Sequence, residues 1–588
     1  MRNLVTNQLD HCVGCNRCIR VCPVNEANSA QMDNTGHVKV HMNENKCIVC
    51  GECIKACHHG ARRYEDDTAR FFNDLRNGSP ISLYAAPAIK SNFDEYGRLF
   101  SWLRSIGVRK IYDVSLGADI CTWAHIRYIQ KHGPKPIISQ PCPAIVNYIL
   151  KYKNELLKNL SPVHSPMLCT AVYMKNYEKV TGKIASLSPC IAKAHEFEAT
   201  GLTDYNVTFQ KLHEYMKANS VSLPATSSGF DNYEAGLGSL YPMPGGLKEC
   251  VEHYVGKQLR VDKSEGPTIV YKALDEYAKQ RTNKLPVLFD VLNCAEGCNA
   301  GTGCAEHLDV FEINTKMDAL RQASIKEDHV QYMDELFKKF DETLRLEDFI
   351  RTYTPTPVSS ISVNKEKIEA AFLELGKFDE EARTFDCGAC GSDKCIEFAI
   401  LVAKGLNIPE NCMEKMHEDM NKEHSETQGV LDNFLRSSEV VVGETSSIGA
   451  MVKEIIERMT DVTDAIASYN QMITDIERIS EKVSIISLNA SVEAAKAGAH
   501  GRAFDVVAKE IRSLAQSSAD SAAKTKEASA KANGAMESVN KSVLKINDKV
   551  QSSLVNISAT ADDTKKMLLE KDKLDKKQKQ VRGKKKIV

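Results

Sequence analysis

Residues 289–304 read FDVLNCAEGCNAGTGC, and this stretch sets the organisation of the central part of the chain. A short apolar run, typical of a buried strand, ends next to Cys294, and Cys298 follows four residues later. Glycines around the two cysteines let the backbone come close to a large group, because glycine carries no side chain. We therefore expect this stretch to wrap an inorganic cluster.

The stretch belongs to a block, residues 67–352, in which short β-branched runs alternate with amphipathic helical stretches. This alternation predicts an open α/β fold. Three of its predicted strands run directly into cysteines, which are Cys142, Cys190 and the pair Cys294 and Cys298. Because ligands of such folds gather beyond the carboxyl ends of the strands, we expect the four cysteines to converge on one site. For any one of them alone, a buried structural cysteine is the alternative.

The composition limits the class of protein. A chain of 588 residues is long enough for several domains. Its formal charge of −2, with 43% hydrophobic and 26% charged residues, points neither to nucleic acid nor to an acidic substrate. The 20 cysteines, without a secretory signal or an apolar run of membrane length, favour reduced thiolates that hold metal in a cytoplasmic protein. Residues 576–588 form a basic tail, which we interpret as a solvated charge run or a docking patch.

Residues 1–66 carry two cysteine runs with the spacing of a two-cluster ferredoxin. The first run is C-x2-C-x2-C-x3-C-P, and the second repeats it with His58 in the place of the proline. In such pairs the fourth cysteine of each run binds the other cluster. We therefore expect two [4Fe–4S] clusters, one on Cys12, Cys15, Cys18 and Cys57, and the other on Cys47, Cys50, Cys53 and Cys22. A pair of zinc sites is the alternative, but zinc needs no such interlock.

Three segments of the central block together resemble the active-site motifs of the [FeFe]-hydrogenase family, which are SQPCP at 139–143, SPCIAK at 188–193 and DVLNCAEGC at 290–298. The resemblance implies a two-lobed α/β hydrogenase-type domain. It also implies an H-cluster, which is a [4Fe–4S] cubane joined to a two-iron subsite that carries CO and cyanide. By this resemblance the cubane ligands are Cys142, Cys190, Cys294 and Cys298, and the sulfur of Cys298 also bridges to the two-iron subsite.

The same resemblance assigns the surroundings of the two-iron subsite. Lys193 falls on the lysine that pairs with one cyanide, and Pro87 and Ala88, after Ala86, fall on the loop that covers the other. A cation beside an anionic ligand is favourable in a dry pocket. Lys193, Pro87 and Ala88 are therefore our candidates for the catalytic environment.

The chain departs from the family pattern where protons would move. Heterolytic cleavage of H₂ needs a base beside the open iron and a proton wire to solvent. Pro141 stands in place of the first relay cysteine, and Ala124 and His125 stand in place of a glutamate pair. Ser188 and Leu292 replace two methionines. We expect low turnover, which suits a sensor because a sensor needs occupancy rather than flux. The alternative is another proton wire, through Cys121, Cys169, His125 or Glu196.

Residues 353–425 are expected to form a small helical iron–sulfur domain behind the proline-rich segment TYTPTPVSS. The pattern CGACGSDKCIEFAILVAKG, with a later NC, is similar to the four-cysteine domain that accompanies corrinoid proteins and sensory hydrogenases. The resemblance implies one further [4Fe–4S] cluster, with zinc as the alternative, on Cys387, Cys390, Cys395 and Cys412. Four cysteines are left without a role, which are Cys121, Cys169, Cys250 and Cys304.

Residues 426–575 have a different character, with no cysteine, proline or tryptophan and with apolar residues at spacings of three and four. Sustained heptads of this kind predict a coiled coil. A glycine-containing break at 498–501 lies near the middle, so we expect a long antiparallel hairpin with arms of about 70 residues, each about 100 Å long. Two arms alone have half a core, so we expect a homodimer that forms a four-helix bundle.

The tip of this hairpin, ISLNASVEAAKAGAHGRAFDVVAKEIRSLA, resembles the signalling tip of methyl-accepting chemotaxis proteins. The resemblance implies contact with a histidine kinase and a coupling protein of the chemotaxis type, through Asn489, Glu493, Lys496, Arg502 and Phe504. Lys496 stands where the family has an arginine, and Ala499 and His500 stand where it has an acidic residue and a glutamine. An ordinary structural coiled coil is the alternative, but heptads alone specify only the core.

The order of these parts suggests a soluble sensor, in which H₂ or the redox state of an H-cluster-type site controls a chemoreceptor-like hairpin. Its expected partners are H₂ or an electron carrier, a second copy of the chain and the kinase with its coupling protein. Three alternatives stay open. They are an active hydrogenase that the coiled coil dimerises, a redox sensor with the cubane alone, and a chemoreceptor for an unrelated signal.

Overall fold

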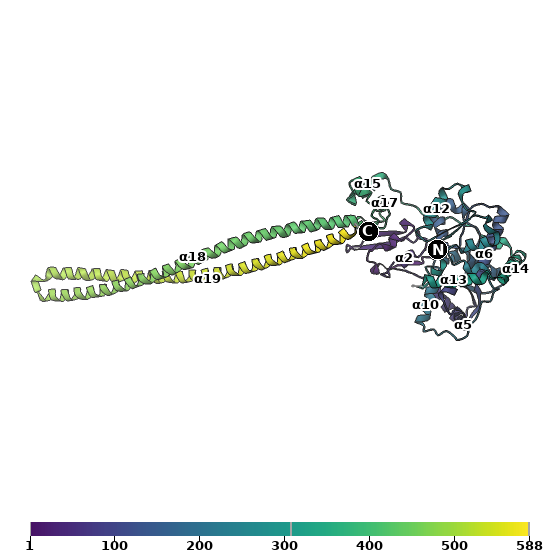
Figure 1. Cartoon of the computed structure of the whole chain (residues 1–588). Helices are drawn as coiled ribbons and strands as arrows, with labels where there is room; N and C mark the ends of the chain where they lie inside the picture. The colour runs from purple at the N-terminus through teal and green to yellow at the C-terminus, as the bar shows by residue number, and fades with distance from the viewer. Residues whose placement is uncertain (1, 306–308, 586–588) are drawn as a thin grey trace. The chain divides into compact units, whose positions relative to one another are not determined.

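Figure 1 shows the computed structural model, which describes residues 2–305 and 309–585, and for Lys257, 327–328 and 572–585 only the backbone. The chain divides into two compact units, Met1–Met416 and His417–Val588. Of the predicted basic tail, residues 576–585 continue the last helix, and residues 586–588 lie outside the described residues. Among the described residues, no helix combines the length and the apolar character that crossing a bilayer requires.

The first unit begins with a small module of two antiparallel strand pairs. Strand β1 (Val5–Asn7) pairs with β4 (Arg62–Tyr64), so the two ends of the module close on each other. Strand β2 (Asn28–Met32) pairs with β3 (Val38–Met42). Each cysteine run leads into one short helix, and these are α1 (Arg17–Arg20) and α2 (Glu52–Lys55). The two runs therefore have the same local structure, as their common spacing requires.

The central block contains two parallel sheets, which confirms the predicted α/β fold. The four-stranded sheet has the order β6-β5-β8-β9, with bounds Val108–Asp113, Ile81–Ala85, Lys183–Ser188 and Tyr205–Thr208. The three-stranded sheet has the order β10-β11-β7, with bounds Val261–Glu265, Leu288–Leu292 and Ile137–Ile138. Strands β5 and β11 are buried along their whole length, as expected for parallel strands that are covered on both faces.

Helices cover these sheets and leave the carboxyl ends of the strands to face a shared interior. Their bounds are α3 (Thr68–Arg76), α4 (Ile89–Asn92), α5 (Tyr96–Ser105), α6 (Val114–His132), α7 (Pro143–Tyr152), α8 (Pro166–Val172), α9 (Lys193–Thr200), α10 (Phe209–Ala218), α11 (Gly246–Val255), α12 (Val270–Lys279), α13 (Val310–Ser324) and α14 (Glu327–Thr343). Helix α6 lies in the centre and is buried over most of its length. It begins directly after β6, where the side chain of Asp113 caps it by accepting from the Ser115 amide at 2.8 Å.

A third part of the first unit contains α15 (Lys365–Glu374), α16 (Glu380–Arg383) and α17 (Cys395–Ala403), and we call it the four-cysteine domain. It packs on the N-terminal module through a buried carboxylate. Glu26 accepts from Lys46 Nζ at 2.5 Å in its own module and from Lys404 Nζ at 2.7 Å across the contact. Burial raises the pKa of Glu26, but the two lysines outweigh burial and lower it. The Ala30 amide donates to Leu406 O at 3.0 Å beside this triad.

The second unit is a hairpin of two helices, α18 (Met413–Lys496) and α19 (Arg502–Lys585), which run side by side in Figure 1. Each helix has 84 residues, so the expected arms of about 70 residues were too short. The expectation followed the apolar repeat alone. The helices continue beyond it because the flanking stretches, such as MEKMHEDMNKEHSETQ at 413–428, contain no proline and many good helix formers.

Buried positions of the hairpin recur at multiples of seven, as a coiled-coil seam requires. On α18 they include Val452, Met459, Ile473, Ser480, Ser487 and Ala494. A second heptad series remains half-exposed, with 41–55% of each residue accessible, and consists of Ile448, Ile455, Val462, Tyr469 and Ile476. One hairpin therefore covers only one of its two apolar stripes.

The Glu26 triad generates a first prediction. Substitution Glu26→Gln leaves the charges of Lys46 and Lys404 without a partner, so we expect the contact to lose about 2 kcal/mol of local stability. Hydrogen exchange measures this at the Ala30 amide, which should exchange about 25-fold faster.

Lys272→Met is the matched control. Lys272, on α12 of the central block, pairs with Asp393 of the four-cysteine domain at 3.3 Å, but both side chains are at least 75% exposed. An exposed pair contributes little, so this variant should exchange like the unaltered chain. If the Ala30 amide of Glu26→Gln exchanged as slowly as that of the unaltered chain, the triad would not stabilise the contact.

Candidate metal centre

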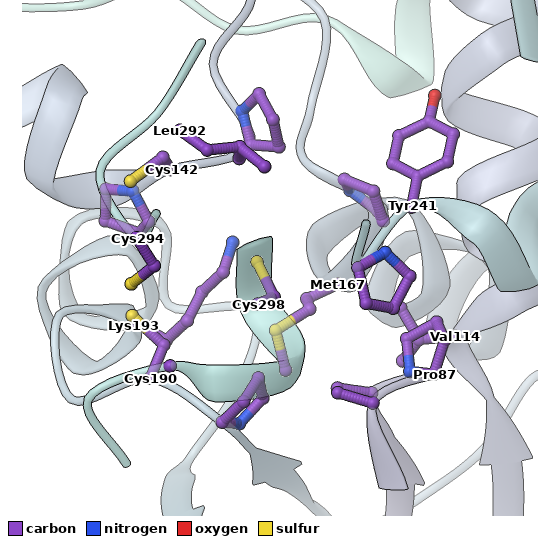
Figure 2. Close-up of a pocket in the computed structure, with 18 of the residues that line it drawn as sticks. Pro87, Val114, Cys142, Met167, Cys190, Lys193, Tyr241, Leu292, Cys294 and Cys298 are labelled. Atoms are coloured by element: carbon purple, nitrogen blue, oxygen red, sulfur yellow. The ribbon is translucent and has the colours of Figure 1, made fainter. Parts of the chain in front are cut away.

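A cavity lies where the strand ends of the two sheets meet (Figure 2). Its wall comes from the segments that follow β5, β6, β7, β8 and β11, so both sheets contribute. The wall is apolar apart from a few side chains and contains Ala86, Pro87, Ala88, Val114, Pro141, Pro143, Pro166, Met167, Pro189, Pro242 and Leu292. Proline has no amide hydrogen, so these segments bring few unpaired donors into the cavity.

All four predicted ligands of the central block line this cavity, which are Cys142, Cys190, Cys294 and Cys298. Figure 2 shows the sulfurs of Cys142, Cys294 and Cys190 on one side, with Cys298 between them and the apolar side chains of Met167 and Pro87. The arrangement therefore separates a thiol-rich part of the cavity from an apolar part, and Cys298 stands at the boundary.

Burial raises the pKa of all four thiols. At Cys190 the charge of Cys142 adds to burial and the charge of Lys193 opposes it, which leaves the pKa of Cys190 at about 11. Without metal, these thiols are neutral at ordinary pH. Metal binding replaces the protons and forms thiolates, so the cavity gains negative charge only when it is loaded.

Glycines bring the cysteine loops of the two sheets together. A methyl group built on Gly301 would lie 2.3 Å from Pro189 O, and one on Gly297, whose φ is +66°, would lie 2.1 Å from Pro242 O. The Gly303 amide donates to Pro189 O, and the Cys298 amide donates to Pro242 O, both at 2.7 Å. No larger residue fits at Gly301 without separating the loop of Cys298 from that of Cys190.

Lys193 also lines the cavity, and the side chains of Glu196 and Ser165 hold its ammonium group. Its Nζ donates to Glu196 Oε2 at 2.6 Å and to Ser165 Oγ at 3.1 Å, and the lysine and glutamate side chains are 7% and 6% exposed. Ser165 in turn donates to Glu196 Oε2 at 2.9 Å. Pro87 and Ala88, the other two predicted environment residues, lie in the wall. The three residues of the predicted environment are therefore together.

Pro141 lines the cavity at the place where the sequence lacks a relay cysteine. Among the described lining residues there is no aspartate, glutamate or histidine, and the polar ones are the cysteines, Lys193, Tyr241 and Asn293. Sequence reasoning did not find Tyr241 or Met167, because each comes from a segment without a strand-end cysteine. Hence this wall offers no carboxylate or imidazole to accept a proton directly.

The alternative relay residues form a buried network outside the cavity wall. The sulfurs of Cys121 and Cys169 each lie 3.3 Å from His164 O, and His125 Nε2 lies 2.9 Å from Ser161 Oγ. Burial raises the pKa of Cys121, but the hydrogen bond from Cys169 and the charge of His125 lower it to about 5. None of these three side chains reaches the wall, whereas Glu196 contacts Lys193, which does.

The two remaining cysteines are buried structural residues. Cys250 Sγ donates to Leu237 O, and Cys304 Sγ donates to Asn299 O, both at 3.4 Å. Burial raises the pKa of both thiols. Neither side chain lines the cavity, so neither joins the four predicted ligands.

Thiols of the two N-terminal cysteine runs lie near one another. Burial raises the pKa of Cys50, and the neighbouring thiols Cys22, Cys53 and Cys47 raise it further, so the fourth cysteine of the first run lies with the second run. Cys18 lies with Cys12 and Cys15 by the same criterion. Cys57, the eighth, is half-buried at the end of α2.

In the four-cysteine domain, Cys395 and Cys412 belong to the core, Cys390 is half-buried and Cys387 is exposed. Burial raises the pKa of Cys390, and the charges of Cys412 and Cys387 raise it further, so these side chains lie near one another. Cys412 directly precedes α18. Within the described residues, no three His, Cys, Asp or Glu side chains are grouped as ligands of a single metal ion.

The predicted partner residues lie beside the turn between α18 and α19, and all five are exposed, which are Asn489, Glu493, Lys496, Arg502 and Phe504. Lys496 Nζ donates to Glu493 Oε2 at 2.9 Å. Phe504 is 75% exposed.

Comparison with known families identifies three parts of the chain. Residues 79–296 match the iron only hydrogenase large subunit, C-terminal domain, and residues 4–67 match the 4Fe-4S dicluster domain. Residues 436–581 match the methyl-accepting chemotaxis protein signalling domain. These matches confirm the resemblances of the N-terminal module, the central block and the hairpin, and they support iron–sulfur cofactors.

Individual proteins match over single parts. Iron hydrogenase 1 of Clostridium pasteurianum is 25% identical over 281 residues, which are 41% of this chain and 49% of that protein. Methyl-accepting chemotaxis protein I of Escherichia coli is 41% identical over 78 residues, 13% of this chain and 14% of that protein. A variant of [FeFe]-hydrogenase HydA1 from Chlamydomonas reinhardtii aligns over 50% of this chain and 100% of its own, with a TM-score of 0.39 and 15% identity. The chain thus spans about half or less of these curated relatives.

Gly301 generates the second prediction. Substitution Gly301→Ala places a methyl group against Pro189 O and moves the Cys298 loop away from Cys190, although it removes no ligand. We expect a lower content of iron and sulfide per chain after cluster reconstitution, with the N-terminal module unaffected. Chemical iron analysis of the purified variant measures this.

Gly229→Ala is the control, because a methyl group on Gly229 meets no atom within 4 Å. It should retain the full iron content. A Gly301→Ala variant with unchanged iron would show that the close approach of the two loops is not needed for metal binding.

Proposed function

We propose that the chain is a sensor, in which an H-cluster-type iron–sulfur site reads H₂ or redox state and a chemoreceptor-type hairpin transmits the result. One observation carries this proposal. Four cysteines and one lysine converge on an apolar cavity, in a chain that also contains a chemotaxis signalling domain.

The cavity fits the H-cluster by the chemistry of its donors. Cys142, Cys190, Cys294 and Cys298 would hold the cubane, and Cys298 stands between the thiol-rich and apolar parts, where a bridging sulfur is needed. The apolar part offers space without competing ligands. When bound, the cluster would supply an iron site for H₂ and a store for electrons.

The protein residues have separate tasks around this site. Lys193, fixed by Glu196 and Ser165, presents a positive charge that suits an anionic ligand such as cyanide. The prolines and alanines of the wall exclude water, which strengthens that attraction. Pro141 cannot accept or donate a proton, so we propose that turnover is slow and that occupancy is the output.

We propose that the other cysteine groups also hold [4Fe–4S] clusters, two in the N-terminal module and one in the four-cysteine domain. The ligands of the last cluster are Cys387, Cys390, Cys395 and Cys412. Because Cys412 directly precedes α18, a change of charge at that group acts next to the first turn of the hairpin. A coupling of about 1–3 kcal/mol would be enough for a switch.

The hairpin supplies the output. Its second, half-exposed heptad series supports a homodimer, since two copies of the hairpin would cover these apolar residues in a four-helix bundle. We propose that the exposed tip, with Glu493 and Phe504, binds a histidine kinase and its coupling protein.

An active hydrogenase is the second candidate, and Glu196 favours it. The Glu196 carboxylate pairs with Lys193, which lines the cavity, and Glu196 is a different position from the missing relay at Pro141. It could therefore accept a proton that leaves the cavity by way of Lys193. Rapid H₂ evolution with a reduced electron donor would favour the enzyme and contradict the sensor.

Infrared spectroscopy after maturation tests the cofactor and is the third prediction. The unaltered chain should show CO and cyanide bands, because the proposed two-iron subsite would carry these ligands. Cys298→Ala should lose them, since it removes the bridging sulfur, and Cys250→Ala, which alters a thiol outside the cavity, should keep them. If the spectrum of the unaltered chain lacked these bands, the two-iron subsite would be rejected and the proposal would retain only a cubane.

A reconstituted kinase array tests the output and is the fourth prediction. Kinase activity should change when N₂ is replaced by H₂, and Glu493→Ala at the tip should abolish this response while it leaves the infrared bands in place. If the bands are present and kinase activity ignores H₂ in the unaltered chain, the sensor proposal is wrong.

A further inference from the structure

A buried arginine lies between the two cysteine groups of the N-terminal module. Arg62 is 3% exposed. Its Nη2 donates to Asn28 Oδ1 at 2.8 Å and to Val40 O at 3.3 Å, and lies 3.8 Å from Cys18 Sγ. Its Nη1 is buried and has no hydrogen-bond partner in the described structure.

No carboxylate within the described residues forms an ion pair with Arg62. Two other buried cations differ in this respect, since Lys193 pairs with Glu196 and Lys46 pairs with Glu26. Burying a guanidinium without an anion costs several kcal/mol, so its surroundings must supply negative charge in the functional state.

The surroundings of Arg62 are thiols of both groups. Burial raises the pKa of Cys18, whereas the charge and the hydrogen bond of Arg62 lower it. Cys53 belongs to the same buried cluster as Cys18 and Val40, and Cys47 packs against that cluster. Cys18 belongs to the first predicted ligand set, and Cys53 and Cys47 belong to the second. One cation therefore acts on both sets.

Thiolate ligation makes an iron–sulfur site net negative, because four thiolates outweigh the charge of the iron–sulfide core. We propose that Arg62 is the shared counter-cation of the two cluster sites in the N-terminal module, and that it raises the reduction potential of both. The inference rests on the proposed [4Fe–4S] assignment. Reduction adds one more negative charge beside the guanidinium, which stabilises the reduced form more than the oxidised form.

Arginine suits this position better than lysine would. A guanidinium stays protonated over the ordinary pH range and has five donors in a fixed plane. Asn28 and Val40 O occupy one end of that plane, which leaves Nη1 directed away from both. The unused donor is thus available to a sulfur of a bound cluster, and hydrogen bonds to sulfur also raise the potential.

The test is an EPR-monitored titration with dithionite on the full chain, reconstituted with iron and sulfide. In Arg62→Met, we expect at least a tenfold lower ratio of reduced to oxidised cluster at a fixed potential, which is a negative shift of about 59 mV for a one-electron couple. Arg62→Lys keeps the charge and should shift less. Arg63→Met is the matched control, because Arg63 is the exposed neighbour and donates to Gly60 O at 3.2 Å.

Asn28→Asp gives a second, independent variant. It keeps Arg62 and places a carboxylate on its Nη2, so the new charge competes for the guanidinium and should also shift both midpoints to lower potential. Loss of iron from this module in Arg62→Met alone, with both Arg62→Lys and Arg63→Met loaded, supports the counter-cation role as well.

Unchanged midpoints in loaded Arg62→Met and Asn28→Asp overturn the inference, and so does an equal shift in Arg63→Met. The unaltered chain separates this outcome from failure of the proposed function. If it shows no [4Fe–4S] signals after reconstitution and reduction, the cofactor assignment fails, and the role of Arg62 fails with it.

Discussion

The contact between Gly301 and the carbonyl of Pro189 holds the candidate centre together. Pro189 follows β8 of the four-stranded sheet, and Gly301 follows β11 of the three-stranded sheet, so one contact without a side chain joins the loops of both. The hydrogen bond from the Gly303 amide to Pro189 O fixes the same approach. The positions of Cys190 and Cys298 depend on this contact, because each cysteine lies within three residues of it. The cavity is therefore a product of two separately folded sheets and one shared junction.

Some buried cations of the first unit have a carboxylate partner in the chain and others do not. Lys193 has Glu196, and Glu26 has two lysines, so these groups are compensated by the polypeptide itself. The Arg62 guanidinium instead contacts the sulfur of Cys18 and the amide oxygens of Asn28 and Val40, and its Nη1 has no hydrogen-bond partner in the described structure. A charge that its own chain does not neutralise is the one that responds most to the state of a bound group. This contrast distinguishes Arg62 from Lys193 and Lys46, and its contact with a cysteine sulfur distinguishes it from Lys377, which donates to Ala382 O.

Repeats and strand ends are visible in a sequence because they follow fixed spacings. The cysteine runs, the three cysteine-bearing strand ends and the heptads were predictable for this reason, and the parallel sheets and the hairpin agree with them. The partners of Lys193 and the walls contributed by Met167 and Tyr241 were not predictable, since they come from segments far apart in the chain. Arg62 looks in the sequence like its exposed neighbour Arg63, and only packing distinguishes them. The true length of the arms was missed because the apolar repeat ends before the helix does.

The start of α18 constrains how a signal could enter the hairpin. Cys412 is a core residue of the four-cysteine domain, and the helix begins at the next residue, Met413. Residues 413–428 contain neither proline nor glycine, and α18 continues as one helix across Gly429 and Gly443 into the heptad region. A rotation or shift at Cys412 would thus pass along a continuous helix instead of being absorbed by a loop. In the proposed homodimer, where a second hairpin covers the other apolar stripe, such a shift would change the packing between the copies, and a small coupling energy would be enough for a switch.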